Sequence, residues 1–229
     1  MKICIYDSGI GGRSVYRLLE QYIEEHELSA QFQLHYFGDE ENFPYGTKTE
    51  DELRQIIFKN IKRFQDEGFD CIAVACNTAS AVVERHWEEL NGPESIRTIV
   101  RPTVDIVNRN PEQYPSLYVI ASEFTANNHI YQRAINRVQP GIKIVEVAAQ
   151  QLINHIEVGD VKQYTLEVEN SIKSVQDNAT LLLGCTHFSY IDALFYDLMQ
   201  KHQKQFQIID PAKEMAKAVE KWMIGKVVE

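Results

Sequence analysis

One short segment occurs twice in this chain, and the repetition constrains the fold more than any other feature of the sequence. The first copy, residues 72–80, places Cys76 after a run of apolar residues; the second, residues 181–189, places Cys185 in the same way. In both copies two small or polar residues follow and a helical pattern begins, which is typical of a buried parallel strand that runs into a helix. Open α/β sheets bind ligands at the carboxyl ends of their strands. We therefore expect the two thiols to occupy equivalent places in two similar halves and to flank one bound molecule.

Strand and helix patterns alternate along the whole chain, which favours a doubly wound α/β fold with mostly parallel sheets. One expected helix follows residues 122–125 and runs through Ile130 and Ile135, and Asp210 with Pro211 is a good start for a last helix. The two halves repeat the same order of elements. The expected strands are 2–6, 32–37, 70–75, 98–100, 117–121, 142–147, 180–183 and 206–209.

Charge, hydropathy and cysteine content exclude several classes of protein. The net charge is −10 and no basic tract occurs, which argues against nucleic acid or an anionic membrane surface as a partner. No apolar run approaches membrane-spanning length, and Asp7 comes too early for a signal peptide. Four cysteines in 229 residues are too few for a disulfide scaffold, so we expect a reduced, cytoplasmic protein. Cys71 and Cys76 bracket one expected strand and do not form a close pair, which argues against a zinc site.

Two loops of the first half are candidates for ligand contact. Residues 7–12, Asp-Ser-Gly-Ile-Gly-Gly, join a strand to a helix, and they form either a plain turn or a cradle for a small anion. The carboxylate of Asp7 would oppose a phosphate but could orient an ammonium group or a thiol. Residues 38–48 form a long loop of the kind that makes ligand walls, and Thr49 with Glu52 predicts a capping box for the next helix.

The two repeated cysteines are the candidate reactive groups. A thiol next to a helix N-terminus is expected to have its pKa lowered from about 8.5, which would make it a usable nucleophile or base. The alternative is that cysteine serves only as a small buried apolar residue, and Cys4 and Cys71 are interpreted in that way. An acid and a base on opposite faces of a planar carbanion suit the inversion of a stereocentre.

Groups that could assist such a reaction lie beside the thiols in the sequence. His187 could take a proton from Cys185, although a structural histidine is an equal alternative, and Asp7 could assist near Cys76. The N–H groups at the two helix starts, together with hydroxyl groups, could stabilise the carbanion. The hydroxyl groups in question belong to Ser8, Thr78 and Thr186.

Four motifs resemble the glutamate racemases of the cofactor-independent aspartate/glutamate racemase superfamily. They are residues 7–12, 37–48, 75–80 and 183–187, and they occur in family order over most of the chain. The resemblance implies two pseudo-symmetric α/β domains, each a mostly parallel sheet flanked by helices, with the active site in the cleft between them. It implies a first domain of residues 1–97 completed by 206–229, and a second domain of residues 98–205.

The same resemblance implies racemisation of glutamate by two bases, without pyridoxal phosphate, metal or another cofactor. Cys76 would act on the D-enantiomer and Cys185 on the L-enantiomer, with Asp7, His187 and Glu157 as assisting groups. The substrate glutamate would be held by Asp7, Ser8, Tyr45, Gly46, Asn77, Thr78, Thr125, Thr186 and His187. The family's role implies a supply of D-glutamate for peptidoglycan, and hence for cell-wall biogenesis and cell shape, by a homodimer.

The chain departs from the family pattern at two places. Ala149-Gln150 stands where many members have Cys-Pro, and Arg101-Pro102 stands where Glu-Pro is frequent. Two alternatives therefore stay open: a racemase of aspartate or another amino acid, and a catalytically silent amino-acid-binding protein on the same fold. Retention of both cysteines argues against the silent protein, because binding alone needs neither thiol.

Overall fold

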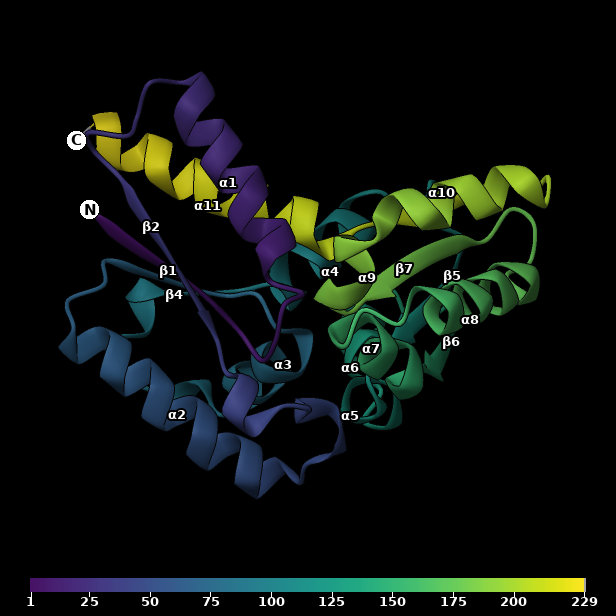
Figure 1. The fold of residues 1–229 in the computed structure, drawn as a ribbon, viewed down its shortest axis with the longest axis horizontal. Coiled ribbons are helices and arrows are strands. Elements are labelled where there is room, and N and C mark those ends of the chain that lie inside the picture. Colours follow the sequence, from purple (N-terminus) through teal and green to yellow (C-terminus); the bar gives the residue numbers. More distant parts are fainter. Residues whose placement is uncertain (229) are drawn as a thin grey trace.

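The computed structural model describes residues 1–228 and contains two parallel sheets of four strands each (Figure 1). The first sheet has the order β2-β1-β3-β4 and the second β6-β5-β7-β8, so the halves share one topology. The strands of the first sheet are β1 (Lys2–Asp7), β2 (Gln33–Gly38), β3 (Cys71–Val74) and β4 (Ile96–Thr98). Those of the second are β5 (Ser116–Ala121), β6 (Lys143–Ala148), β7 (Thr180–Gly184) and β8 (Gln207–Ile209). The expected α/β fold of two pseudo-symmetric halves is confirmed.

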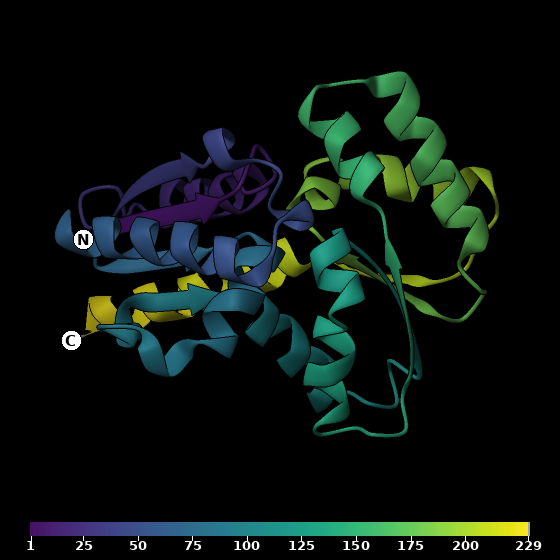
Figure 2. The same cartoon turned by 90° about the horizontal axis from the view of Figure 1, so that it is seen from below.

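Helices surround both sheets, which Figure 2 shows side by side. Those of the first half are α1 (Arg13–Glu25), α2 (Glu50–Asp66) and α3 (Asn77–Arg85). Those from the second half onward are α4 (Val100–Arg109), α5 (Glu123–Asn127), α6 (Ile130–Asn136), α7 (Gln150–Glu157), α8 (Val161–Ser174), α9 (Thr186–Tyr190), α10 (Asp192–Lys201) and α11 (Pro211–Val228). None of the helices within residues 1–228 combines the length and the apolar character needed to cross a membrane.

The local signals for helix starts act as the sequence predicts. Thr49 accepts a hydrogen bond from the N–H of Glu52, whose carboxylate accepts one from Thr49 N–H, so the capping box of α2 is present. Asp210 Oδ1 accepts from Ala212 N at 2.9 Å and caps α11.

Short 3₁₀ turns occur in two of the connections. The loop between β2 and α2 contains η1 (Glu40–Asn42) and η2 (Tyr45–Thr47), and the segment before β4 contains η3 (Trp87–Glu89) and η4 (Pro93–Ser95).

Two expected elements differ in the structure. The strand expected at 98–100 is β4 at Ile96–Thr98, and Val100 already begins α4, because Pro102 is tolerated in the first turn of a helix. The single helix expected through Ile130 and Ile135 is divided into α5 and α6. His129 has a φ of 52° between them, and asparagines at 127 and 128 favour a break over a continuous helix.

The last segment of the chain contacts both halves. Strand β8 pairs in parallel with β7 and therefore lies in the second sheet. The family resemblance had placed this strand, as part of residues 206–229, in the first domain. Helix α11 packs along α1 and also contacts α4 and α9 (Figure 1). One continuous buried cluster includes Ile5 and Val74 of the first sheet together with Val119 and Leu182 of the second. The other limits of the proposed domains stay a prediction.

Candidate active site

The carboxyl ends of the central strands of both sheets meet at one pocket between the halves. In an order such as β2-β1-β3-β4 the chain leaves β1 and β3 in opposite directions, which opens a crevice at their carboxyl ends. Ser8 and Cys76 come from this crevice of the first sheet, and Ser122 and Cys185 from the matching crevice of the second. The pocket is lined by Ser8, Phe43, Pro44, Tyr45, Gly46, Cys76, Asn77, Thr78, Ser122, Gln150, Ile153, Cys185, Thr186 and His187.

Both candidate thiols are free and both line this pocket. Cys76 follows β3 after one intervening residue, and Cys185 follows β7 directly; each stands immediately before a helix. Because β3 and β7 hold the same position in their sheets, the thiols reach the pocket from two sides. The prediction that they flank one shared space is therefore supported by the positions of both residues.

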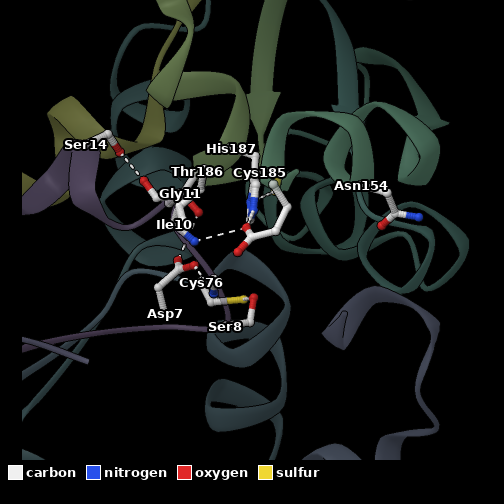
Figure 3. Close-up of polar contacts among 12 residues, drawn as sticks. Asp7, Ser8, Ile10, Gly11, Ser14, Cys76, Asn154, Cys185, Thr186 and His187 are labelled. Carbon is white, nitrogen blue, oxygen red and sulfur yellow. Dashed lines mark hydrogen bonds and ion pairs between the residues drawn. The ribbon is translucent and has the colours of Figure 1, made fainter. Parts of the chain in front are cut away.

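Cys76 lies deep in the site, with only 6% of its surface exposed. Its Sγ is 3.5 Å from Ser8 Oγ (Figure 3). The same Sγ accepts a hydrogen bond from Ala79 N, also at 3.5 Å. Burial raises the pKa of the Cys76 thiol to about 12, and the Asp7 carboxylate acts in the same direction. The expectation that the helix N-terminus would lower this pKa is wrong, because loss of hydration outweighs the N–H donors.

Cys185 has a chain of acid–base groups behind it. His187 Nδ1 lies 3.6 Å from Cys185 Sγ, and His187 Nε2 lies 2.5 Å from Glu157 Oε2 (Figure 3). Burial raises the pKa of Cys185 well above its ordinary value, and the nearby Cys76 adds to the shift. Burial also opposes ionisation of Glu157, but hydrogen bonds from His187 and Ile10 keep its pKa below the ordinary value. Glu157 thus holds the histidine, as the family resemblance implies.

Asp7 lies behind the pocket and does not line it. Its side chain is fully buried, Oδ1 accepts from Gly9 N at 3.0 Å, and Oδ2 accepts from Thr186 Oγ1 at 2.9 Å. Burial raises the pKa of this carboxyl group, although the neighbouring His187 and the two hydrogen bonds act in the opposite direction. Asp7 therefore joins the end of β1 to the start of α9 and is close enough to Cys76 to influence its ionisation.

The glycines of residues 7–12 allow the two halves to approach closely. A Cβ atom on Gly11 would lie 2.6 Å from both His187 N and Thr186 Oγ1. A Cβ atom on Gly9 would lie 2.5 Å from Glu157 Oε2. The loop is thus neither a plain turn nor a free cradle: its backbone packs directly against the acid–base groups of the second half.

The remaining expected binding residues divide between the pocket wall and the layer behind it. Tyr45 and Gly46 line the pocket, but the Tyr45 hydroxyl already contacts Asp39 at 2.5 Å and Tyr6 at 2.6 Å. Thr78 Oγ1 lies 2.8 Å from Ser122 Oγ and thereby joins the halves. Thr125 does not line the pocket; it lies behind Ser122, at 3.0 Å between the hydroxyl oxygens.

Several lining residues were not found by sequence reasoning. Ser122 follows β5 as Ser8 follows β1, so the internal repeat contained a signal that could have located it. Gln150 was recognised only as a departure from the family pattern, yet its side chain contacts Glu123 N at 3.4 Å and Asn154 Oδ1 at 3.2 Å at the pocket wall. Phe43 and Pro44 belong to the loop 38–48 that was expected to form a ligand wall, although neither was singled out. Ile153 carries no chemical signal in the sequence, since apolar residues line pockets and cores alike.

Neutral groups dominate the pocket. Among the described residues that line it there is no lysine or arginine, so a carboxylate must be bound by N–H groups, hydroxyls and the Asn77 amide. Within residues 1–228 no three His, Cys, Asp or Glu side chains are grouped so that they could hold a metal ion. What the site offers is a pair of thiols, a His–Glu pair behind one of them and donors for an anion.

This fold and site define a two-lobed α/β protein with two free thiols in one pocket between its halves. The family model described as Asp/Glu/Hydantoin racemase matches residues 9–219, and the chain belongs to this family. The family expected from the sequence motifs is thereby confirmed.

Relatives and solved structures agree with this assignment. The chain is 28% identical to a glutamate racemase of Limosilactobacillus reuteri over 98% of its own length and 81% of the relative's. It is 31% identical to a glutamate racemase of Fusobacterium nucleatum over 93% and 78% of the two chains. A glutamate racemase structure from Francisella tularensis, in complex with D-glutamate, shares the fold with a TM-score of 0.82 at 24% identity and covers 98% of this chain and 81% of that one.

Proposed function

We propose that this protein is a glutamate racemase that interconverts L- and D-glutamate by two-base proton transfer at the α-carbon. The observation that carries the proposal is that Cys76 and Cys185, from equivalent strand ends, line one pocket. One thiolate removes the α-proton, and the opposite thiol returns a proton to the other face of the planar carbanion. Cys76 acts on the D-enantiomer and Cys185 on the L-enantiomer.

The contacts of His187 suit proton withdrawal from Cys185. With Nε2–H donated to the Glu157 carboxylate, Nδ1 keeps its lone pair and can accept the thiol proton. Asp7 assists on the side of Cys76, because burial raises the pKa of its carboxyl group and makes the carboxylate a stronger base.

Substrate binding follows from the donors at the pocket wall. The carboxylate groups are held by hydroxyls, by the Asn77 amide and by N–H groups at the starts of α3 and α9. Asp7 lies behind this wall and holds the Thr186 hydroxyl in place. The proposed binding residues are Ser8, Tyr45, Gly46, Asn77, Thr78, Thr186 and His187, and Asp7 and Thr125, which do not line the pocket, support this layer from behind.

Glutamate is the proposed substrate, in preference to aspartate, because relatives that are 28% and 31% identical to this chain are glutamate racemases. A racemase of another amino acid and a silent binding protein remain the alternatives, and an exchange assay separates them. Incubation of fresh reduced protein with a panel of L- and D-amino acids in deuterated water should introduce deuterium at the α-carbon of glutamate. Label only in another amino acid would identify that racemase, and label in none would favour the binding protein.

Two variants test the two-base scheme. Cys76→Ala and Cys185→Ala should each lower racemisation about a thousandfold or more, because each removes one of the two acid–base groups. Cys71→Ala is the matched control, since Cys71 is equally buried in β3 but lies outside the pocket. Full activity of either pocket variant, measured by circular dichroism of the substrate, would contradict the scheme.

The cellular part of the proposal is that a homodimer in the cytoplasm supplies D-glutamate for peptidoglycan. Expression in a bacterium that requires external D-glutamate should restore growth without it, and the Cys185→Ala variant should not. Sedimentation equilibrium of the purified protein should give twice the chain mass; a monomer at all concentrations would exclude the homodimer.

A further inference from the structure

An unsatisfied hydrogen-bond donor lies in the pocket wall. Asn77 is 2% exposed, and its Nδ2 has no hydrogen-bond partner among the described residues. Its Oδ1, by contrast, accepts a hydrogen bond from the hydroxyl of Tyr131. A buried donor without a partner is unfavourable unless a ligand supplies the acceptor, and the pocket is where such a ligand would lie.

Tyr131 reaches Asn77 from the other half of the molecule. Asn77 begins α3, whereas Tyr131 belongs to α6 and is fully buried outside the pocket lining. The hydroxyl group stays protonated, because burial raises its pKa well above the ordinary value. It therefore keeps its proton and donates it to the carbonyl oxygen of the Asn77 amide, which leaves Nδ2 without a partner.

The backbone that carries Tyr131 is itself held by a buried carboxylate. Glu146 Oε1 accepts from Tyr131 N at 3.1 Å and from Gln132 N at 3.2 Å, and its Oε2 lies 2.9 Å from His129 Nδ1. The side chain of Glu146 is 1% exposed. It thus caps α6 at the point where the sequence predicted a continuous helix, and the break at His129 makes this cap possible.

We propose that Tyr131 is a positioning residue that holds the Asn77 amide with its oxygen turned away from the pocket, so that Nδ2 donates to a carboxylate of the substrate. A side-chain amide presents an acceptor or a donor according to its orientation, and only the donor binds a carboxylate. The inference rests on the proposed function, because it assigns the Asn77 donor to an amino-acid substrate.

The test is a double-mutant cycle. Tyr131→Phe keeps the ring and removes the hydroxyl, so KM for both glutamate enantiomers should rise about tenfold while kcat changes less than about threefold. Asn77→Ala should also raise KM, and the double variant should resemble Asn77→Ala alone, because the hydroxyl acts through that amide. Tyr118→Phe, at a half-buried position of β5 outside the pocket, is the control and should leave KM unchanged.

Unchanged KM in Tyr131→Phe, or additive effects in the double variant, would overturn the inference. The rise in melting temperature on adding D-glutamate measures binding independently of turnover. If the wild-type protein is stabilised by glutamate but does not racemise it, only the proposed function is contradicted. Loss of that stabilisation in Tyr131→Phe would then still support the inference. A wild-type protein stabilised by no acidic amino acid would contradict both.

Discussion

At the scale of single residues, the site shows how burial and local dipoles compete. The sequence places Cys76 before a helix N-terminus, where an exposed thiol would ionise easily. In the structure the same thiol is 6% exposed and faces a second thiol and a buried carboxylate, and its pKa rises to about 12. The resting thiols are therefore protonated, and a proton acceptor such as His187 is needed to generate a thiolate beside the substrate.

Alkylation of the thiols tests this ionisation. At pH 8 a thiol with a pKa near 12 has a thiolate fraction about a thousandfold lower than an ordinary cysteine. We expect iodoacetamide to modify folded Cys76 at least about a hundredfold more slowly than the same cysteine in urea, with rates read by peptide mass spectrometry.

The pH dependence separates ionisation from simple shielding. The rate in the folded protein should keep rising between pH 8 and 10, while the rate in urea levels off above about pH 9. Parallel curves with a constant ratio would mean that access, and not the pKa, limits the reaction.

At the scale of elements, the junctions between strands and helices carry both stability and chemistry. Ser122 accepts from Thr125 N and Cys76 from Ala79 N, so side chains that cap helices also line the pocket. Asp210 performs the same local task for α11, and its Oδ1 additionally accepts from Ser189 Oγ at 2.6 Å. The cap of α11 thus joins the last helix to α9.

Loss of this cap should destabilise the molecule. Asp210→Ala removes the acceptor for Ala212 N–H and leaves the Ser189 hydroxyl without its partner, so we expect a loss of about 1–2 kcal/mol in the free energy of unfolding. Asp210→Asn is the matched control, because asparagine caps helices nearly as well and should lose less than half as much. Urea unfolding followed by circular dichroism measures both, and equal stability of the alanine variant and the wild type would refute the role of the cap.

At the scale of the whole molecule, the pocket exists only because the two halves meet. Contacts between them include Asp7 with Thr186 and Thr78 with Ser122. The turn at Gly46 packs so closely that a Cβ atom there would lie 2.0 Å from Gln150 Oε1 and 2.8 Å from Ser122 Cβ. The backbone at Gly46 needs no left-handed conformation, so close approach alone requires the glycine.

Gly46→Ala should therefore separate the halves without unfolding either. Because small displacements of acid–base groups reduce rates strongly, we expect kcat/KM to fall about tenfold to a hundredfold with little change in melting temperature. Gly141→Ala is the control, since a Cβ atom there meets nothing within 4 Å. Replacing Gln150 by alanine in the Gly46→Ala background should restore part of the activity; the interpretation fails if Gly46→Ala is fully active.

Much of this architecture was accessible from local patterns. The alternation of strands and helices, the start of α11 at Asp210 and the placement of Cys76 and Cys185 at strand ends depend on neighbouring residues, and the structure confirms them. The division between α5 and α6 was missed, because His129 adopts a left-handed conformation that Glu146, from a later strand, helps to stabilise.

The sequence by itself determined the class of fold, the repeated halves and the chemical groups of the site, since these follow from hydropathy periodicity and motif spacing. Only the tertiary structure decided the protonation of the thiols, the position of Asp7 behind the pocket and the contact of Tyr131 with Asn77. Asp7 and its partner Thr186 are 179 residues apart in the sequence. Burial and hydrogen bonding depend on which distant residues exclude water and supply partners, and no local pattern specifies that.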